Sequence, residues 1–304
     1  MVKGRVVRIV GNEFHVETAS ANLRCSLTNK VRRSREGANK PAAVGDEVEV
    51  EPGEAGEGTF LRTLPRKTKL CRAKGSQGRI EGVLVANAEQ VLAVFSARSP
   101  DPDFRAVDRA LVMGEAGRMK CAIAINKVDL AGPPPEVVAY RAAGYPVFET
   151  CAVTGKGLDE VRAWIAGTTT VLMGPSGVGK SSLLNAIDPE WKRKVGALSE
   201  KIEEGRHTTT WVEMLPLPGG GWIVDTPGIE SFGLWGLEAA HLSEYYPEMR
   251  AFEGKCKYRD CRHDSEPGCA VKAEVESGAF SRRRWEGYQV LQRELAAAEN
   301  APRR

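Results

Sequence analysis

The chain has 304 residues, of which 42% are hydrophobic and 27% charged, with a formal net charge of +3. This length suits two or three domains, each able to bury a core. No apolar run approaches the roughly 20 residues of a membrane-spanning helix, and the start lacks the apolar segment of a signal peptide. We therefore expect a cytoplasmic protein with no membrane partner. We also expect a monomer, which none of these features tests.

Residues 1–72 contain short segments in which apolar and polar residues alternate, which predicts strands with one buried face. These segments are 5–10, 13–17, 23–27 and 47–50. Several short strands in about 70 residues favour an all-β barrel of the OB-fold type. The same region carries fourteen Lys and Arg against nine Asp and Glu, most densely at 30–35. The surplus suits a phosphate-rich partner such as RNA, although residues 30–35 alone could equally be a solvated loop.

Residues 73–238 alternate between predicted strands and helices. Strands are expected at 90–95, 121–125, 168–173 and 221–224, and helices at 104–116, from 136, at 158–166 and at 180–187. The strands are continuous apolar runs, which is typical of strands buried on both faces. This alternation predicts an α/β domain with a mainly parallel sheet.

A phosphate-binding loop lies between the predicted strand 168–173 and the helix that follows. It consists of Gly174, Pro175, Ser176, Gly177, Val178, Gly179, Lys180 and Ser181, followed by Ser182, and matches G-x-x-x-x-G-K-[ST]. Backbone N–H groups of such a loop surround phosphates at a helix N-terminus. We expect Lys180 to contact the β- and γ-phosphates and the Ser181 hydroxyl to bind Mg²⁺.

Guanine recognition is predicted from Asn126, Lys127, Val128 and Asp129 at the end of a buried strand. Guanine presents two adjacent donors, N1–H and the N2 amine, and an acceptor-only carboxylate such as that of Asp129 fits that edge. Asn126 is expected to brace the loop. Cys151 and Ala152 occupy the place of a second base-binding loop, in which the Ala152 N–H would meet the guanine O6.

The remaining nucleotide contacts are expected on either side of the last strand. Asp225 should hold Mg²⁺ and the Gly228 N–H should sense the γ-phosphate, while Thr209, or else Thr208, should complete the Mg²⁺ coordination. Many GTPases place a water-orienting glutamine after this glycine, but this chain has Ile229. His207 is therefore the best internal candidate for the catalytic group, since imidazole can accept a proton from water near neutral pH.

The guanine motif at 126–129 precedes the phosphate loop at 174–181, which in turn precedes Asp225. In an ordinary GTPase the base-reading motif comes last. This order predicts a circularly permuted P-loop GTPase domain.

Residues 239–304 are expected to form a mainly helical domain, with helices at 239–252 and 281–298. Cys256, Cys261, His263 and Cys269 lie within 14 residues, and three thiolates with one imidazole form a closed set of ligands for one structural Zn²⁺. The region around this set is basic (Lys255, Lys257, Arg259 and Arg262), as is Arg282-Arg283-Arg284, which is consistent with an RNA or protein contact.

Over nearly its whole length the chain resembles the RsgA (YjeQ) family of circularly permuted GTPases. The matching residues are Gly45-Asp46, Pro65-Arg66-Lys67, 126–129, 174–182, 205–210, 225–228 and the Cys/His set followed by Ala270-Val271; departures are Cys151 for serine and Glu89 for aspartate. The resemblance implies a factor that binds the small ribosomal subunit and its rRNA late in assembly and converts GTP to GDP faster when bound. It also implies that His207 is catalytic.

Two other readings remain open. In the first, the protein is a GTP-gated RNA-binding scaffold whose hydrolysis is incidental, and stimulation of turnover by small subunits separates it from a GTPase. In the second, it is an ATP-dependent enzyme, which Asp129 disfavours and a competition between guanine and adenine nucleotides would test.

Overall fold

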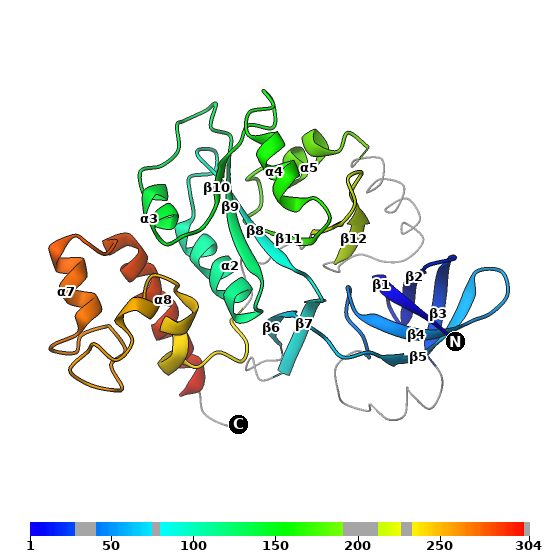
Figure 1. The fold of residues 1–304 in the computed structure, drawn as a ribbon, viewed down its shortest axis with the longest axis horizontal. Helices are drawn as coiled ribbons and strands as arrows, with labels where there is room; N and C mark the ends of the chain where they lie inside the picture. The colour runs from blue at the N-terminus through cyan, green and yellow to red at the C-terminus, as the bar shows by residue number, and fades with distance from the viewer. Residues whose placement is uncertain (28–40, 75–79, 191–211, 226–232, 301–304) are drawn as a thin grey trace.

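The computed structural model describes residues 1–27, 41–74, 80–190, 212–225 and 233–300. Three regions follow one another along the chain: a β-barrel, a central sheet covered by helices, and a helical C-terminal region (Figure 1). In the figure the barrel lies at the right and the C-terminal region at the left of the central sheet. None of the helices in the described ranges is long and apolar enough to cross a lipid bilayer.

The barrel consists of five strands, β1 (Val2–Val10), β2 (Glu13–Thr18), β3 (Asn22–Leu27), β4 (Glu47–Pro52) and β5 (Glu57–Thr63). It closes because β1 pairs with both β2 and β4, and β5 joins β4 to β3. Inward-facing residues such as Phe14 and Phe60, whose ring centroids lie 5.1 Å apart, form its core. The predicted barrel is confirmed. Strand β5 was not predicted, because it begins inside a segment of glycines and glutamates that resembles a turn.

The central sheet has the order β10 (Val147–Glu149), β9 (Lys120–Asn126), β8 (Gln90–Ser96), β11 (Thr169–Met173), β13 (Trp222–Asp225) and β12 (Glu213–Pro216). All neighbouring pairs are parallel except β12 with β13. The mainly parallel sheet is therefore confirmed.

Helices cover both faces of this sheet. On one face, α2 (Phe104–Ala116) and α3 (Val137–Ala142) pack on residues such as Val91 and Phe95. On the other, α4 (Leu158–Ile165) and α5 (Lys180–Ile187) pack on the alternate residues Leu92 and Val94. Burial on both faces explains why these strands are continuous apolar runs.

The barrel and the central sheet are joined edge to edge. Strand β1 pairs with β12 at Arg8 and Glu213, so that both form one continuous 11-stranded sheet. The Arg8 Nε atom lies 3.8 Å from Glu213 Oε1, and Arg5 Nη1 donates to Thr169 Oγ1 at 3.4 Å.

A second junction involves the hairpin of β6 (Lys69–Lys74) and β7 (Ile80–Ala86). Asp46 is fully buried, accepts the Ala43 N–H at 2.7 Å and binds the Arg66 guanidinium through two bonds of 2.7 Å. Gly45 has a φ of +89°, and a Cβ there would lie 2.0 Å from the Ala86 carbonyl oxygen. The Gly-Asp pair therefore fixes the barrel against the end of β7.

The C-terminal region contains the 3₁₀ helices η2 (Ala239–Tyr245) and η3 (Arg250–Phe252) and the α-helices α7 (Ala270–Ser277) and α8 (Arg282–Glu299). The helical segment expected at 239–252 is present as two short 3₁₀ helices rather than as one continuous α-helix. Pro247 lacks an N–H and disfavours helical backbone at the preceding residue, which separates the segment into two short turns. The expected closing helix is confirmed as α8, whereas α7 was not predicted.

Candidate active site and metal centre

The motifs for guanine, phosphate and metal binding meet at one edge of the central sheet. Strands β9, β11 and β13 are parallel and end at Asn126, Met173 and Asp225. Ligands of parallel α/β sheets bind outside the carboxyl ends of the strands. Residues that are about 100 positions apart in the sequence are therefore brought to the same edge.

The phosphate loop connects β11 to α5 through backbone conformations that require glycine. Gly174 has a φ of +155°, and a Cβ there would lie 2.0 Å from the Val94 carbonyl oxygen. Gly179 has a φ of +93°, and a Cβ there would lie 2.4 Å from Asn126 Nδ2. The Lys180 ammonium donates to the carbonyls of Gly174 and Pro175, at 2.6 and 2.8 Å. The lysine thus lies inside the loop that would surround the phosphates.

Asn126 connects the guanine motif to the phosphate loop. It is 1% exposed, and its Nδ2 donates to the Val178 carbonyl at 3.0 Å. Its Oδ1 accepts the Ala152 N–H at 3.4 Å, which is the group expected to meet the guanine O6. These bonds join the guanine motif to the phosphate loop, and the bracing role of Asn126 during nucleotide binding stays a prediction.

Lys127 adds a second connection that the sequence did not reveal. Its ammonium donates to the carbonyls of Ser99 and Gly177, the latter at 2.7 Å, and its φ of +61° is unusual for a residue other than glycine. Carbonyl acceptors carry no residue-type signal, so only the structure could identify Ser99.

The groups expected to contact guanine differ in exposure. Asp129 is exposed, so that its carboxylate is accessible for the base edge, while Val128 is half-buried. Cys151 is 1% exposed, and its Sγ accepts the Thr154 N–H at 3.4 Å. The cysteine therefore supports the turn of its loop as a serine hydroxyl would, through a weaker acceptor.

The expected Mg²⁺ ligands are only partly described. Ser181 and Ser182 lie exposed in the first turn of α5, and Asp225 ends β13. Thr208, Thr209, His207 and Gly228 lie outside the described residues, as do Ile229 and the basic segment 30–35. Their roles stay predictions.

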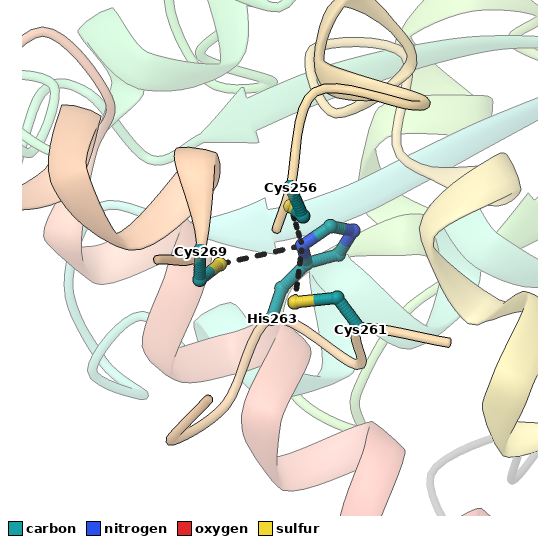
Figure 2. A group of neighbouring side chains, drawn as sticks. All are labelled: Cys256, Cys261, His263 and Cys269. Atoms are coloured by element: carbon teal, nitrogen blue, oxygen red, sulfur yellow. Dashed lines mark hydrogen bonds between the residues drawn. The ribbon is translucent and has the colours of Figure 1, made fainter. Parts of the chain in front are cut away.

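The cysteine cluster forms a compact donor set in the C-terminal region. The donor atoms of Cys256, Cys261, His263 and Cys269 all lie within 4.8 Å of one another. The His263 Nδ1 atom lies 3.5, 3.7 and 3.5 Å from the three sulfur atoms, in chain order (Figure 2). Zn–S bonds of about 2.3 Å and Zn–N bonds of about 2.0 Å give tetrahedral edges of about 3.5 Å. The set could therefore hold a zinc ion.

Surrounding groups act on these ligands in both directions: burial raises the pKa of Cys261 and Cys269, which favours their thiols, whereas backbone N–H donors favour thiolates. Cys256 Sγ accepts the Ala270 N–H at 3.3 Å, and Cys269, the N-cap of α7, accepts the Lys272 N–H at 3.4 Å. N–H donors at a helix N-terminus stabilise thiolates. Burial lowers the pKa of His263, which favours the neutral imidazole that binds metals.

Helix α8 holds the loop that carries His263. Trp285 Nε1 donates to the His263 carbonyl at 2.7 Å, and the Tyr288 hydroxyl donates to the Arg262 carbonyl at 2.9 Å. His263 itself has a φ of +58°. The ring orientation therefore depends on α8 as well as on the loop.

The suggestion that Arg282-Arg283-Arg284 is a contact surface is wrong for two of its three residues. Arg284 is 1% exposed and pairs with Asp108 and Glu248, and Arg283 lies 3.1 Å from Asp108. Only Arg282 is exposed. Arg283 and Arg284 instead join α8 to the buried Asp108 of α2.

Comparisons with known proteins identify the family of this chain. Residues 63–235 match the RsgA GTPase family. A protein of Gemmatimonas aurantiaca named "Small ribosomal subunit biogenesis GTPase RsgA" is 41% identical over 96% of this chain and 97% of its own length. A protein of the same name from Moorella thermoacetica is 38% identical over 99% of both chains.

Two crystal structures have the same fold. YjeQ from Thermotoga maritima superimposes with a TM-score of 0.75 at 32% identity, over 99% of both chains. YloQ, described as a circularly permuted GTPase, gives a TM-score of 0.72 at 29% identity, over 100% of this chain and 97% of its own. The chain therefore belongs to the RsgA family of circularly permuted GTPases and is a GTP-hydrolysing enzyme.

Proposed function

We propose that this GTPase acts in the late maturation of the small ribosomal subunit and hydrolyses GTP to GDP faster when bound to that subunit. The observation that carries the proposal is the full-length similarity to proteins named as small ribosomal subunit biogenesis GTPases, at 41% and 38% identity. The similarity includes the barrel and the C-terminal region as well as the GTPase sheet. We divide the chain into an RNA-binding barrel at 1–72, the GTPase domain at 73–238 and a zinc-binding domain at 239–304.

In this proposal each described residue of the site has a defined task. Asp129 accepts the two donors of the guanine edge, and Asn126 keeps the base loop in register with the phosphate loop through its bond to the Val178 carbonyl. The backbone N–H groups of 174–181 bind phosphate oxygens, and Lys180 exchanges its carbonyl partners for phosphate oxygens.

The Ser181 hydroxyl and the Asp225 carboxylate are oxygen donors of the kind that Mg²⁺ prefers, and we infer that they hold it together with Thr209. The ion would neutralise charge on the phosphates. His207 would orient or deprotonate the attacking water, a role that Ile229 cannot fill. Cys256, Cys261, His263 and Cys269 would hold one structural Zn²⁺, which organises the C-terminal loop and takes no part in hydrolysis.

The proposed partners are GTP and GDP, the small subunit and its rRNA, and we expect a cytoplasmic monomer. The scaffold with incidental hydrolysis is not favoured, because both relatives are named as GTPases.

The decisive experiment is a GTP hydrolysis assay on the purified full chain, alone and with saturating small subunits. We expect small subunits to increase turnover roughly tenfold or more, as partners that complete a GTPase site do. Large subunits serve as the control and should have little effect. Unchanged turnover with bound small subunits would reject the stimulated mechanism in favour of the scaffold.

A further inference from the structure

The loop of the Cys/His cluster exposes an aromatic ring. Tyr258 lies between Cys256 and Cys261 and is 43% exposed. It is the only aromatic among the strongly exposed large hydrophobic side chains of the described residues. The other tyrosines of the C-terminal region are less exposed, and two of them, Tyr246 and Tyr288, are buried. Tyrosine has an apolar ring and a polar hydroxyl, and such side chains are enriched at binding interfaces.

Hydrogen bonds fix the backbone that carries the ring, and a neighbouring cation lies against the ring. The Lys257 N–H donates to the Gly268 carbonyl at 3.0 Å, and the Cys261 N–H donates to the Tyr258 carbonyl at 3.4 Å. The Lys257 stem packs closely on Gly268, where a Cβ would lie 2.9 Å from Lys257 Cβ. The Lys257 ammonium lies 5.5 Å from the centroid of the Tyr258 ring. A ring carried by a fixed backbone segment loses less conformational entropy on binding than one in an unconstrained loop.

Positive charge is in excess in the loop that carries this ring. Lys255, Lys257, Arg259 and Arg262 are all exposed, and Asp260 is the only acidic residue between 255 and 262. The ion pairs that the described residues form in the C-terminal region involve other cations, namely Arg109, His241, Arg250, Arg283, Arg284 and Arg293. The four loop cations are therefore accessible to an anionic ligand.

We propose that Tyr258 is a stacking platform for an unpaired RNA base, and that Lys255, Lys257, Arg259 and Arg262 bind the phosphates on either side of that base. An aromatic face beside cations is how proteins hold single-stranded nucleic acids. A duplex fits less well because its bases are already stacked on one another. An acidic peptide would use the cations but not the ring. The inference rests on the proposed function only in taking ribosomal RNA as the natural ligand.

The test measures binding of the full chain to a short fluorescein-labelled single-stranded RNA of mixed sequence by anisotropy. Tyr258→Ala should weaken binding roughly 5- to 150-fold, the range for loss of one base–aromatic stack. Tyr258→Phe keeps the ring and should bind as wild type. Tyr258→Leu keeps an apolar side chain without an aromatic face and should bind as weakly as the alanine variant. The zinc content of each variant shows whether the loop is intact.

Salt dependence tests the cations. Replacing Lys257 or Arg259 with Gln should each reduce the slope of log affinity against log salt by about 0.7, the value for one phosphate contact on a single strand. Lys120→Gln removes an exposed charge at the start of β9 and serves as the matched control, with no change of slope.

Several outcomes would overturn the inference. These are wild-type affinity in Tyr258→Ala with zinc retained, equal losses in the Phe and Ala variants, or a duplex bound as tightly as the single strand. Efficient displacement of the RNA by poly-glutamate would assign the loop to a protein partner instead. The proposed function is tested by a different measurement. If it is wrong, small subunits will not stimulate GTP hydrolysis by the wild type, whereas binding of the single-stranded RNA will be unchanged.

Discussion

Arg284 of α8 forms a buried ion pair with Asp108 of α2, joining residues 176 positions apart. The guanidinium also donates to Glu248 at 2.7 Å and lies 4.5 and 4.8 Å from the ring centroids of Tyr246 and Tyr140. Gly287 is required nearby, since a Cβ there would lie 2.0 Å from Asp108 Oδ2. The C-terminal region is therefore fixed to the half of the GTPase domain that reads the base.

Replacing Arg284 with methionine should destabilise the protein strongly. The substitution keeps much of the apolar volume but leaves two carboxylates without their main cation, which costs about 3–5 kcal/mol for a buried pair. Urea unfolding followed by circular dichroism measures the free energy of unfolding. Arg293→Met is the matched control on the same helix. The Arg293 side chain, which pairs with Asp264, is 64% exposed. Its ion pair should therefore contribute less than about 1 kcal/mol to the free energy of unfolding. Similar losses of unfolding free energy in both variants would contradict a special role for the buried pair of Arg284 with Asp108.

This pair also marks the limit of what the sequence could predict. The phosphate loop and the guanine motif were predictable because each is continuous in the chain and has a fixed local context. The role of Arg284 was not, because its partners Asp108 and Glu248 come from separate elements. A run of three arginines is indistinguishable from a basic surface until the fold is known. For the same reason the sequence predicted β1 correctly but could not predict that it pairs with β12.

The Cys/His set should hold one zinc ion per chain. Metal analysis of freshly purified protein should give a zinc-to-protein ratio near one, and Cys261→Ser should lower both that ratio and the melting temperature, because a structural zinc site contributes directly to folding. Cys71→Ser is the control. Cys71 is half-buried beside Glu81, distant in sequence from the cluster, and its loss should leave zinc content unchanged. A wild-type protein that carries no metal would refute the assignment.

Asp129→Asn should change the base preference of the nucleotide site. The asparagine amide would face the guanine donors with a donor of its own, and charge-assisted bonds are worth about 1.5–3 kcal/mol each, so GTP affinity should fall roughly 100-fold. Xanthosine triphosphate has a carbonyl in place of the N2 amine and should bind the variant better than GTP. Competition against a fluorescent nucleotide measures both affinities.

The control for this substitution is Asp159→Asn, which alters a carboxylate that is 94% exposed on α4. It should leave the nucleotide preference unchanged. If Asp129→Asn bound GTP and xanthosine triphosphate as the wild type does, Asp129 would not read the base.

Glu213, at the seam between barrel and sheet, should give the protein a pH-dependent stability. Burial raises the pKa of its carboxyl above the usual 4.5, and the Arg8 charge opposes that rise only in part. The folded state therefore binds the proton more tightly than the unfolded state. The contribution of Glu213 to stability falls as pH rises from about 4.5 through the folded-state pKa, and stays low above it.

Unfolding of wild type and Glu213→Gln between pH 4 and pH 7 tests this sign, because glutamine does not titrate in that range. The wild type should lose stability relative to the variant as the pH rises. Glu57→Gln, an exposed position on β5, should show no such trend. A relative gain in wild-type stability with rising pH would mean that the Arg8 charge outweighs desolvation at this seam.

His207→Ala should reduce GTP hydrolysis and leave nucleotide affinity close to that of the wild type. The prediction rests on the sequence, because Ile229 occupies the position after Gly228 and has no polar group to orient water. Loss of a general base costs about 10²- to 10⁴-fold in turnover. Turnover with saturating small subunits and GTP affinity by equilibrium titration separate the two effects. Lys180→Ala should instead lose affinity and turnover together, since Lys180 lies inside the phosphate loop. If His207→Ala behaved like Lys180→Ala, His207 would be a binding residue, and the group acting on water would have to come from the ribosomal partner.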